Sequence, residues 1–154
     1  MEFAGEIRVP AGRAAVFDRL CDARFFAACV GGVRDLAEID AARYEAVMET
    51  TLAYLKLRFA VRVELVRLDP PSRIEARIEG TPMGIVGRLS ATSVTTLEEV
   101  GAGTRVRYAV AASLTGRLGA IGRPVLNAKA REMERSFAAR LAAAFAPAPA
   151  GTAP

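Results

Sequence analysis

From Val33 to Leu114 the chain alternates apolar and polar residues, and this period of two constrains the fold more than any other feature. Such a period belongs to a β-strand with one face buried and the other in water. It is clearest over residues 57–65, where Leu, Phe and Val occupy the odd positions and charged residues most of the even ones. One-sided strands are typical of antiparallel sheets. The pattern therefore predicts about six antiparallel strands in this region.

Shorter segments of different character precede the alternating region. Residues 2–9 also alternate and predict a first strand, which ends at Pro10. The ranges 13–20 and 23–30 have the 3.6-residue period of short helices, and Asp22 is placed to cap the second one. The chain therefore begins with a strand followed by two short helices.

The sequence returns to helical character between residues 117 and 145. Apolar residues recur every four positions from Met133 onward, and polar residues occupy a separate face. Pro124 predicts a kink or a restart, because proline cannot continue the hydrogen bonding of a helix. The polar face consists of Lys129, Glu132, Ser136 and Arg140.

Together these elements predict an α+β domain over residues 1–146, in which a curved antiparallel sheet of about seven strands wraps one long C-terminal helix. Residues 147–154 are rich in Pro and Ala and predict a tail or the start of a linker. Small residues at inward strand positions indicate either close approach of the helix or a cavity filled by a ligand. The pattern alone leaves both interpretations open. These small residues are Ala46, Ala76, Ala91 and Ala112.

The absence of histidine narrows the chemistry. It excludes Ser-His-Asp and Cys-His catalysis and any His-ligated metal, so neither a metal site nor a catalytic residue is predicted. Cys21 and Cys29 lack the spacing of a redox or metal motif and are expected to be buried thiols. The strand carboxylates have outward parity, which argues against an enzyme working through a buried acid. They are Glu49, Glu64, Glu75 and Glu79.

The net charge of +4 permits attraction to anionic surfaces without requiring it. On the outer face of the strands basic residues alternate with glutamates, which favours an ordinary solvated surface over a lipid or protein contact. No aromatic platform or dense basic stripe indicates nucleic-acid binding. The N-terminal residues lack a signal-peptide core, and no apolar run approaches the roughly 18 residues that span a bilayer, so a cytoplasmic protein is expected.

Three motifs in a fixed order resemble a known family. Residues 22–33, DARFFAACVGGV, are similar to a D-P-x-x-L-x-x-C-I-P-G-C signature, and residues 68–71, LDPP, to its D-P-P turn. Residues 96–122 resemble its third block through TLEE, GT, Tyr108, GRL and IG. Over about residues 1–146 the chain resembles the G-subunit family of carbon monoxide dehydrogenase, within the START-like (SRPBCC) helix-grip superfamily. It departs from the signature at Gly31, where the family has Pro, and at Val33, where it often has Cys.

The resemblance implies a helix-grip fold with an internal cavity for a lipophilic molecule. It implies a non-catalytic accessory of molybdenum hydroxylases of the aerobic CO dehydrogenase type, which recruits the enzyme to the cytoplasmic membrane and serves electron or quinone transfer. The expected ligand is an isoprenoid quinone, menaquinone or ubiquinone, with no covalently bound cofactor. The expected location is cytoplasmic, peripheral on the inner face of the membrane. The alternatives are a cyclase-like or hydrolase-like enzyme of the same fold and a ligand-sensing or chaperone-like module.

Candidate binding residues are inward positions near the long helix, although each is also compatible with plain core packing. Tyr108 is the preferred donor to a quinone carbonyl, ahead of Tyr44 and Tyr54, because a buried hydroxyl needs a partner. Three glycines at the start of the long helix indicate either a mobile portal or close backbone packing. The portal candidates are Gly116, Gly119 and Gly122. The ligand-binding candidates are Phe26, Val30, Leu55, Phe59, Val63, Met83, Tyr108, Leu118, Ile121 and Val125.

Overall fold

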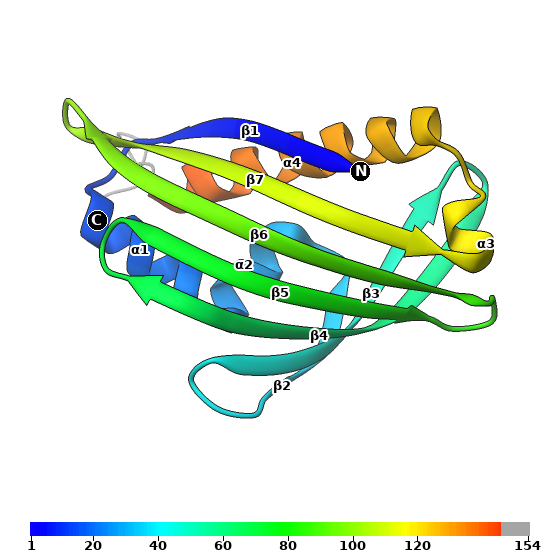
Figure 1. Cartoon of the computed structure of the whole chain (residues 1–154). Coiled ribbons are helices and arrows are strands. Elements are labelled where there is room, and N and C mark those ends of the chain that lie inside the picture. Colours follow the sequence, from blue (N-terminus) through cyan, green and yellow to red (C-terminus); the bar gives the residue numbers. More distant parts are fainter. Residues whose placement is uncertain (146–154) are drawn as a thin grey trace, which may run out of the picture.

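The computed structural model describes residues 1–145, which form a curved seven-stranded sheet partly covered by helices (Figure 1). All neighbouring strands are antiparallel, and their order is β1-β7-β6-β5-β4-β3-β2. Strands β2 to β7 follow one another in a meander, and β1 pairs with β7. The predicted tail at 147–154 lies outside the described residues. The strands are β1 Glu2–Val9, β2 Val33–Glu38, β3 Arg43–Leu52, β4 Leu55–Asp69, β5 Arg73–Pro82, β6 Gly87–Val100 and β7 Gly103–Thr115.

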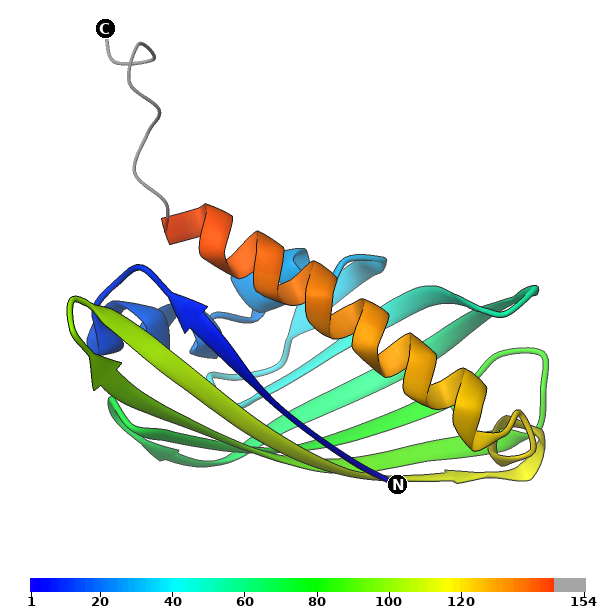
Figure 2. The ribbon, with the colours of Figure 1, turned by 90° about the horizontal axis from the view of Figure 1, so that it is seen from above.

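Four helices accompany the sheet: α1 Arg13–Cys21, α2 Ala23–Val30, α3 Gly116–Gly119 and α4 Arg123–Phe145. Asp22 caps α2 as predicted, since its Oδ1 accepts hydrogen bonds from the amides of Arg24 and Phe25 at 3.0 and 3.2 Å. Figure 2 shows α4 running diagonally across the concave side of the sheet. This arrangement confirms the predicted helix-grip fold.

The C-terminal helical region is divided in two. The expectation of helical structure from residue 117 onward is corrected at residues 120–122, which form a turn between α3 and α4. Gly122 has a φ of 102°, a left-handed conformation that favours glycine. The restart predicted from Pro124 is confirmed, because proline is the second residue of α4, where the amide hydrogen has no partner to lose.

The alternation in β4 divides its side chains between the two faces of the sheet. Leu57 and Phe59 are buried beneath the helical layer, whereas Lys56 and Arg58 are exposed on the other face. The strand carboxylates lie outward as predicted, and three of them form exposed ion pairs. Glu49 pairs with Arg34, Glu64 with Arg77 at 3.5 Å, and Glu75 with Arg73 at 2.9 Å. Such surface pairs contribute little stability, from zero to about 1 kcal/mol each.

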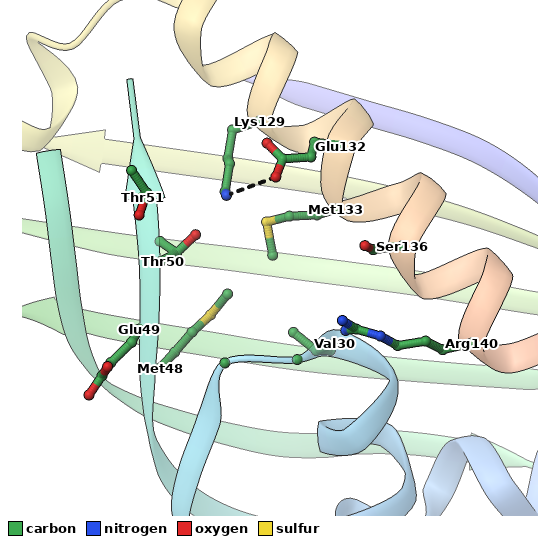
Figure 3. A pocket seen from close by; sticks show the side chains of 12 residues that line it. Val30, Met48, Glu49, Thr50, Thr51, Lys129, Glu132, Met133, Ser136 and Arg140 are labelled. Carbon is green, nitrogen blue, oxygen red and sulfur yellow. Dashed lines mark ion pairs between the residues drawn. The ribbon is translucent and has the colours of Figure 1, made fainter. Parts of the chain in front are cut away.

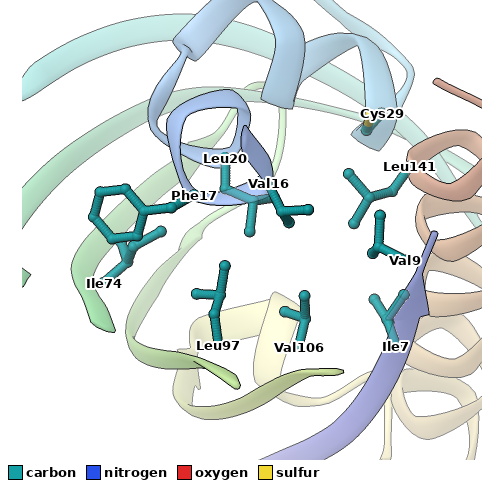
Figure 4. Close-up of a cluster of buried hydrophobic side chains, with 10 residues drawn as sticks. All are labelled: Ile7, Val9, Val16, Phe17, Leu20, Cys29, Ile74, Leu97, Val106 and Leu141. Carbon is teal, nitrogen blue, oxygen red and sulfur yellow. The ribbon is translucent and has the colours of Figure 1, made fainter. Parts of the chain in front are cut away.

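Two groups of buried side chains close the two ends of the grip. The α1-end cluster lies under α1 and α2, where Leu141 of α4 meets strands β1, β5, β6 and β7 (Figure 4). It consists of Ile7, Val9, Val16, Phe17, Leu20, Cys29, Ile74, Leu97, Val106 and Leu141. The α3-end cluster is smaller and consists of Leu52, Leu57, Phe59 and Leu118.

The sheet has two free edges, strands β1 and β2. Along β2 the pairing register shifts between Arg34 and Ala37, and Asp35 has a φ of 55°. At the other edge the amino group of Met1 donates to the carbonyl of Ala112 on β7 at 2.7 Å. The outward residues of β1 are charged at Glu2, Glu6 and Arg8.

Candidate functional site

The middle of the concave sheet surface is the least covered part of the interior. Val63, Ile78 and Val110 face the helical side there, yet they are only half-buried and belong to neither cluster. On the strand β6 side their cross-strand neighbours are small, because Ile78 lies opposite Ala91 and Val110 opposite Ser93. Their other neighbours are large, since Val63 lies between Tyr44 and Ile78 and Val110 opposite Phe3. We call this surface the inner floor. It consists of Val63, Ala76, Ile78, Ala91, Ser93, Val110 and Ala112.

The position of α4 explains why Val63, Ile78 and Val110 stay only half-buried. The closest backbone contacts of α4 are with α2, β1 and β3, so the helix is supported at the sides of the concave surface rather than from the central strands. Well-packed interiors leave few voids, and half-buried valines and isoleucine beneath a helix depart from that rule. Of the two interpretations of the small inward residues, this geometry favours a cavity.

A cleft of about 340 Å³ opens between the end of α2, strand β3 and helix α4 (Figure 3). This volume lies within the range of sites that hold small molecules. Val30, Met48 and Met133 give the cleft an apolar part, and hydroxyl and charged groups form the rest of its lining. The complete lining is Val30, Gly31, Gly32, Met48, Glu49, Thr50, Thr51, Lys129, Glu132, Met133, Ser136 and Arg140.

The polar face of α4 lines one side of the cleft, and the sequence alone does not reveal this position. Lys129 projects toward the cleft, with its side chain only 17% exposed and its Nζ 3.5 Å from Glu132 Oε1 (Figure 3). Ser136 and Arg140 follow along the same side of the helix. The helical period identified these residues as one face, but not the open space in front of it.

Arg140 and the glycine pair form one wall of the cleft. Gly31 and Gly32 have φ values of 78° and 71°, and Arg140 Nη1 donates to the carbonyl of Cys29 at 3.3 Å. The guanidinium occupies the space that a Cβ at Gly31 would need. Burial raises the pKa of the Cys29 thiol while Arg140 lowers it less strongly, so the thiol remains neutral near pH 7.

The three tyrosines have different surroundings. The Tyr108 hydroxyl lies beside the Glu134 carboxylate of α4, in space left by Gly5, whose hypothetical Cβ would lie 2.8 Å from Glu134 Oε1. Burial, and then the hydrogen bond to Glu134, raise the pKa of Tyr108. Its hydroxyl therefore already has an acceptor. Tyr44 lies opposite Val63 on the concave side, and burial raises its pKa to about 12.

Three of the predicted binding residues lie in different parts of the interior. Val30 lines the cleft and Val63 belongs to the inner floor. Phe26 packs on Phe137 of α4, with ring centroids 5.2 Å apart, against the α1-end cluster. Of these three residues, only Val30 lines the cleft.

Other predicted binding residues close the α3 end instead. Phe59 and Leu118 are buried in the α3-end cluster, and Ile121 and Val125 pack against it. Leu55 and Met83 require a correction, because they are 42% and 45% exposed and belong to neither buried cluster. Leu55 is the first residue of β4, opposite the buried Leu52, and Met83 directly follows β5, so both lie where their strands end.

Tyr54 likewise lies in the turn between β3 and β4 and is 90% exposed, so it is not an inner hydroxyl. Of the three candidate donors, only Tyr44 lies on the concave side without a carboxylate partner among residues 1–145.

The glycines at 116, 119 and 122 have local structural reasons. A Cβ at Gly116 would lie 2.9 Å from the Cα of Gly87, and one at Gly119 would lie 2.5 Å from the carbonyl oxygen of Leu114. Close backbone packing therefore accounts for the first two, and the left-handed turn for Gly122. A mobile portal in this segment stays a prediction.

The curved antiparallel sheet closed over by one long helix makes this a protein of the helix-grip class. Within that class the chain belongs to the CoxG family, the G-subunit family of carbon monoxide dehydrogenase, which it matches over residues 5–146. No match was found among curated proteins.

Solved structures share the fold at low sequence identity. A conserved protein from Geobacillus kaustophilus has a TM-score of 0.86 and 21% identity, with 94% of this chain and 95% of that chain covered. A protein from Chromobacterium violaceum has a TM-score of 0.71 and 16% identity, covering 96% and 98%. Ara h 8.0201 has a TM-score of 0.67 and 12% identity, covering 94% and 97%.

Two further features of the described residues bear on the class of site. Across residues 1–145 no group of acidic or cysteine side chains is arranged to hold a metal ion. In the same part of the chain, none of the helices has both the length and the apolar character needed to cross a membrane.

Proposed function

We propose that the chain binds a lipophilic molecule, an isoprenoid quinone such as menaquinone or ubiquinone, between the sheet and α4, and releases it unchanged. The observation that carries this proposal is the inner floor, a largely apolar surface that faces α4, where Val63, Ile78 and Val110 stay only half-buried between the two buried clusters. Transfer of a lipophilic molecule onto such a surface is favourable, because both apolar surfaces leave water.

Two polar groups would orient the quinone ring. Quinone carbonyls accept hydrogen bonds, and Lys129 of the cleft and Tyr44 of the concave sheet surface are the donors that this geometry favours. Lys129 pairs with Glu132 at the cleft, whereas Tyr44 does not line the cleft and lies opposite Val63 of the inner floor. Tyr108 is less suited than expected from the sequence, because its hydroxyl already lies beside Glu134.

Membership of the CoxG family supports an accessory role beside carbon monoxide dehydrogenase. In the proposed role the protein recruits a molybdenum enzyme of this type to the cytoplasmic membrane and carries quinone or electrons between them. A catalytic role is less well supported, because the strand carboxylates lie on the outer face, three of them in ion pairs.

Filling the inner floor tests the proposal. We expect Ala91→Phe to abolish binding of added menaquinone, measured by native mass spectrometry, because the ring would occupy the ligand's place. Its thermal unfolding should stay close to that of the parent protein, because the proposal places unfilled space between α4 and the half-buried Val63 and Ile78. Ala109→Phe, an exposed position on β7, is the matched control and should bind normally.

Two results would contradict the proposed function. If neither menaquinone nor ubiquinone binds the parent protein, the proposal is wrong. If Ala91→Phe also lowers stability by the 1–3 kcal/mol that is typical of overpacking, the inner floor is ordinary core.

A further inference from the structure

Beyond the α3-end cluster, the molecule displays large apolar side chains at the tips of its loops. Tyr54, between β3 and β4, is 90% exposed, and Val86, between β5 and β6, is 77% exposed. Leu55 and Met83 lie beside them on the same two loops and are also exposed. Single exposed apolar residues are common, but four on neighbouring loops form a patch. We call the region formed by residues 52–58, 81–89 and 114–125 the loop-tip end.

The three segments of the loop-tip end are joined into one surface. The amide of Arg117 donates to the carbonyl of Val86 at 2.9 Å, and the amide of Met83 donates to the carbonyl of Arg58 at 2.8 Å. Leu118 packs beneath them in the α3-end cluster. Figures 1 and 2 both show the β3–β4 turn, the β5–β6 loop and α3 at the same end of the molecule. The exposed side chains therefore belong to one connected surface.

The charge of the loop-tip end has a single sign. Its three segments contain five basic residues and no acidic one, whereas the whole chain has a net charge of only +4. Among the described residues, only Arg58 of this group has an ion-pair partner, Glu49, at 3.4 Å. On the outer face of the sheet, by contrast, arginines pair with glutamates. The five cations are Lys56, Arg58, Arg88, Arg117 and Arg123.

We propose that the loop-tip end docks on the surface of an anionic lipid bilayer. The apolar tips enter the boundary between headgroups and acyl chains, and the surrounding cations contact lipid phosphates. Tyr54 suits this boundary because its ring is apolar and its hydroxyl reaches water. A bilayer fits better than an acidic protein, because the apolar groups project from separate loop tips and do not form a groove or flat face.

This docking deepens the proposed function, on which it rests, by naming the face that meets the membrane. Thr50 and Thr51 line the cleft and directly precede Leu52 at the loop-tip end. Docking therefore brings the cleft close to the lipid surface. A lipophilic ligand would then have a short path between bilayer and inner floor.

Vesicle flotation of the full chain tests this inference. We expect binding to vesicles of phosphatidylcholine mixed with phosphatidylglycerol, weak binding to phosphatidylcholine alone, and loss of binding at high salt. Arg117→Gln with Arg123→Gln should weaken binding by about fivefold for each cation, roughly 25-fold together. Tyr54→Ser with Val86→Ser should weaken it as well, without changing thermal unfolding.

Matched variants elsewhere provide the controls. Arg131→Gln with Arg135→Gln removes two exposed cations from α4, and Ile39→Ser removes an exposed apolar side chain from the β2–β3 loop. Both should bind vesicles like the parent protein. The inference is overturned if the parent protein does not bind anionic vesicles, or if these controls lose as much binding as the loop-tip variants.

A separate measurement of quinone binding, made without vesicles, distinguishes the docking proposal from the proposed function. Loop-tip variants should retain it. Failure of the parent protein to bind quinone, together with loop-tip-dependent vesicle binding, would remove the proposed function and leave the docking surface. If the loop-tip variants instead lose binding to purified carbon monoxide dehydrogenase and keep vesicle binding, this surface is a protein interface and the bilayer proposal is wrong.

Discussion

The two ends of the grip hide their apolar residues to very different extents. At one end α1 and α2 cover the α1-end cluster, and Val16 and Leu141 are fully buried there. At the other end a four-residue helix and two loops close the α3-end cluster. Beyond that cluster Tyr54 and Val86 remain in contact with solvent.

This difference separates the end that holds the fold together from the end that faces the bilayer in the proposed docking. The α1 end connects α1 and the C-terminal part of α4 to four strands of the sheet, so loss of packing there loosens several elements at once. The α3 end is built from short segments that can adjust locally. Short loops suit a contact surface, because they lie at the surface of the protein and leave side chains accessible to another molecule.

The largest expected effect compares one buried leucine from each end. Leu141→Ala should lower the free energy of unfolding by about 3–5 kcal/mol, because the surrounding strands and helices cannot collapse into the cavity. Leu118→Ala should cost nearer 2 kcal/mol, since the four-residue α3 can shift to refill the space. Urea unfolding measures both values. Equal losses would mean that the two ends anchor the fold equally.

An intermediate effect concerns alkaline pH. Burial raises the pKa of Tyr44 to about 12, from an unfolded value near 10, so the folded state keeps its proton where the unfolded state has lost it. The contribution of Tyr44 to stability should therefore be complete below pH 10 and fall, by on the order of 2 kcal/mol, as the pH rises toward 12. Urea unfolding across this range should show a smaller fall in Tyr44→Phe. An unchanged fall would place the titration elsewhere.

The smallest expected effect is at the loop-tip end. Val86→Ser should change the free energy of unfolding by less than about 0.5 kcal/mol, because the side chain is 77% exposed and fills no core space. Thermal unfolding measures this difference, with Leu118→Ala as the reference for a buried position nearby. A loss of more than about 1 kcal/mol in the free energy of unfolding would show that Val86 contributes to stability. The two ends would then differ less than described above.

Local patterns in the sequence predicted most of the architecture. The alternation over 57–65, the cap at Asp22 and the restart at Pro124 each depend on neighbours within a few residues, and each is confirmed. Leu55 and Met83 show the limit of this reasoning. A period of two assigns a side chain to a face of the sheet but not to a degree of burial, because Leu55 pairs with the buried Leu52 across the β3–β4 hairpin and is still 42% exposed.

The candidate site depends on contacts between distant segments, which periodicity does not encode. Lys129 and Arg140 belonged to a recognisable polar face, but only the placement of α4 against β3 and α2 shows that they line a cleft. The hydrogen bond between Tyr108 and Glu134 likewise could not be predicted from the sequence. Gly5 gave the one available hint, because a glycine at an inward strand position marks close approach of another group.

The two free edges of the sheet have a consequence for behaviour at high concentration. An unpaired strand edge is a template for strands of other molecules, and a protein that exposes apolar tips has added reason to avoid such growth. At one edge the register shift near Asp35 distorts β2. At the other edge the charged outward residues of β1 disfavour pairing with a flat, apolar strand. Tyr54 and Val86 are thus exposed at the loop-tip end, while edge-to-edge pairing with sheets of other molecules is opposed at both edges.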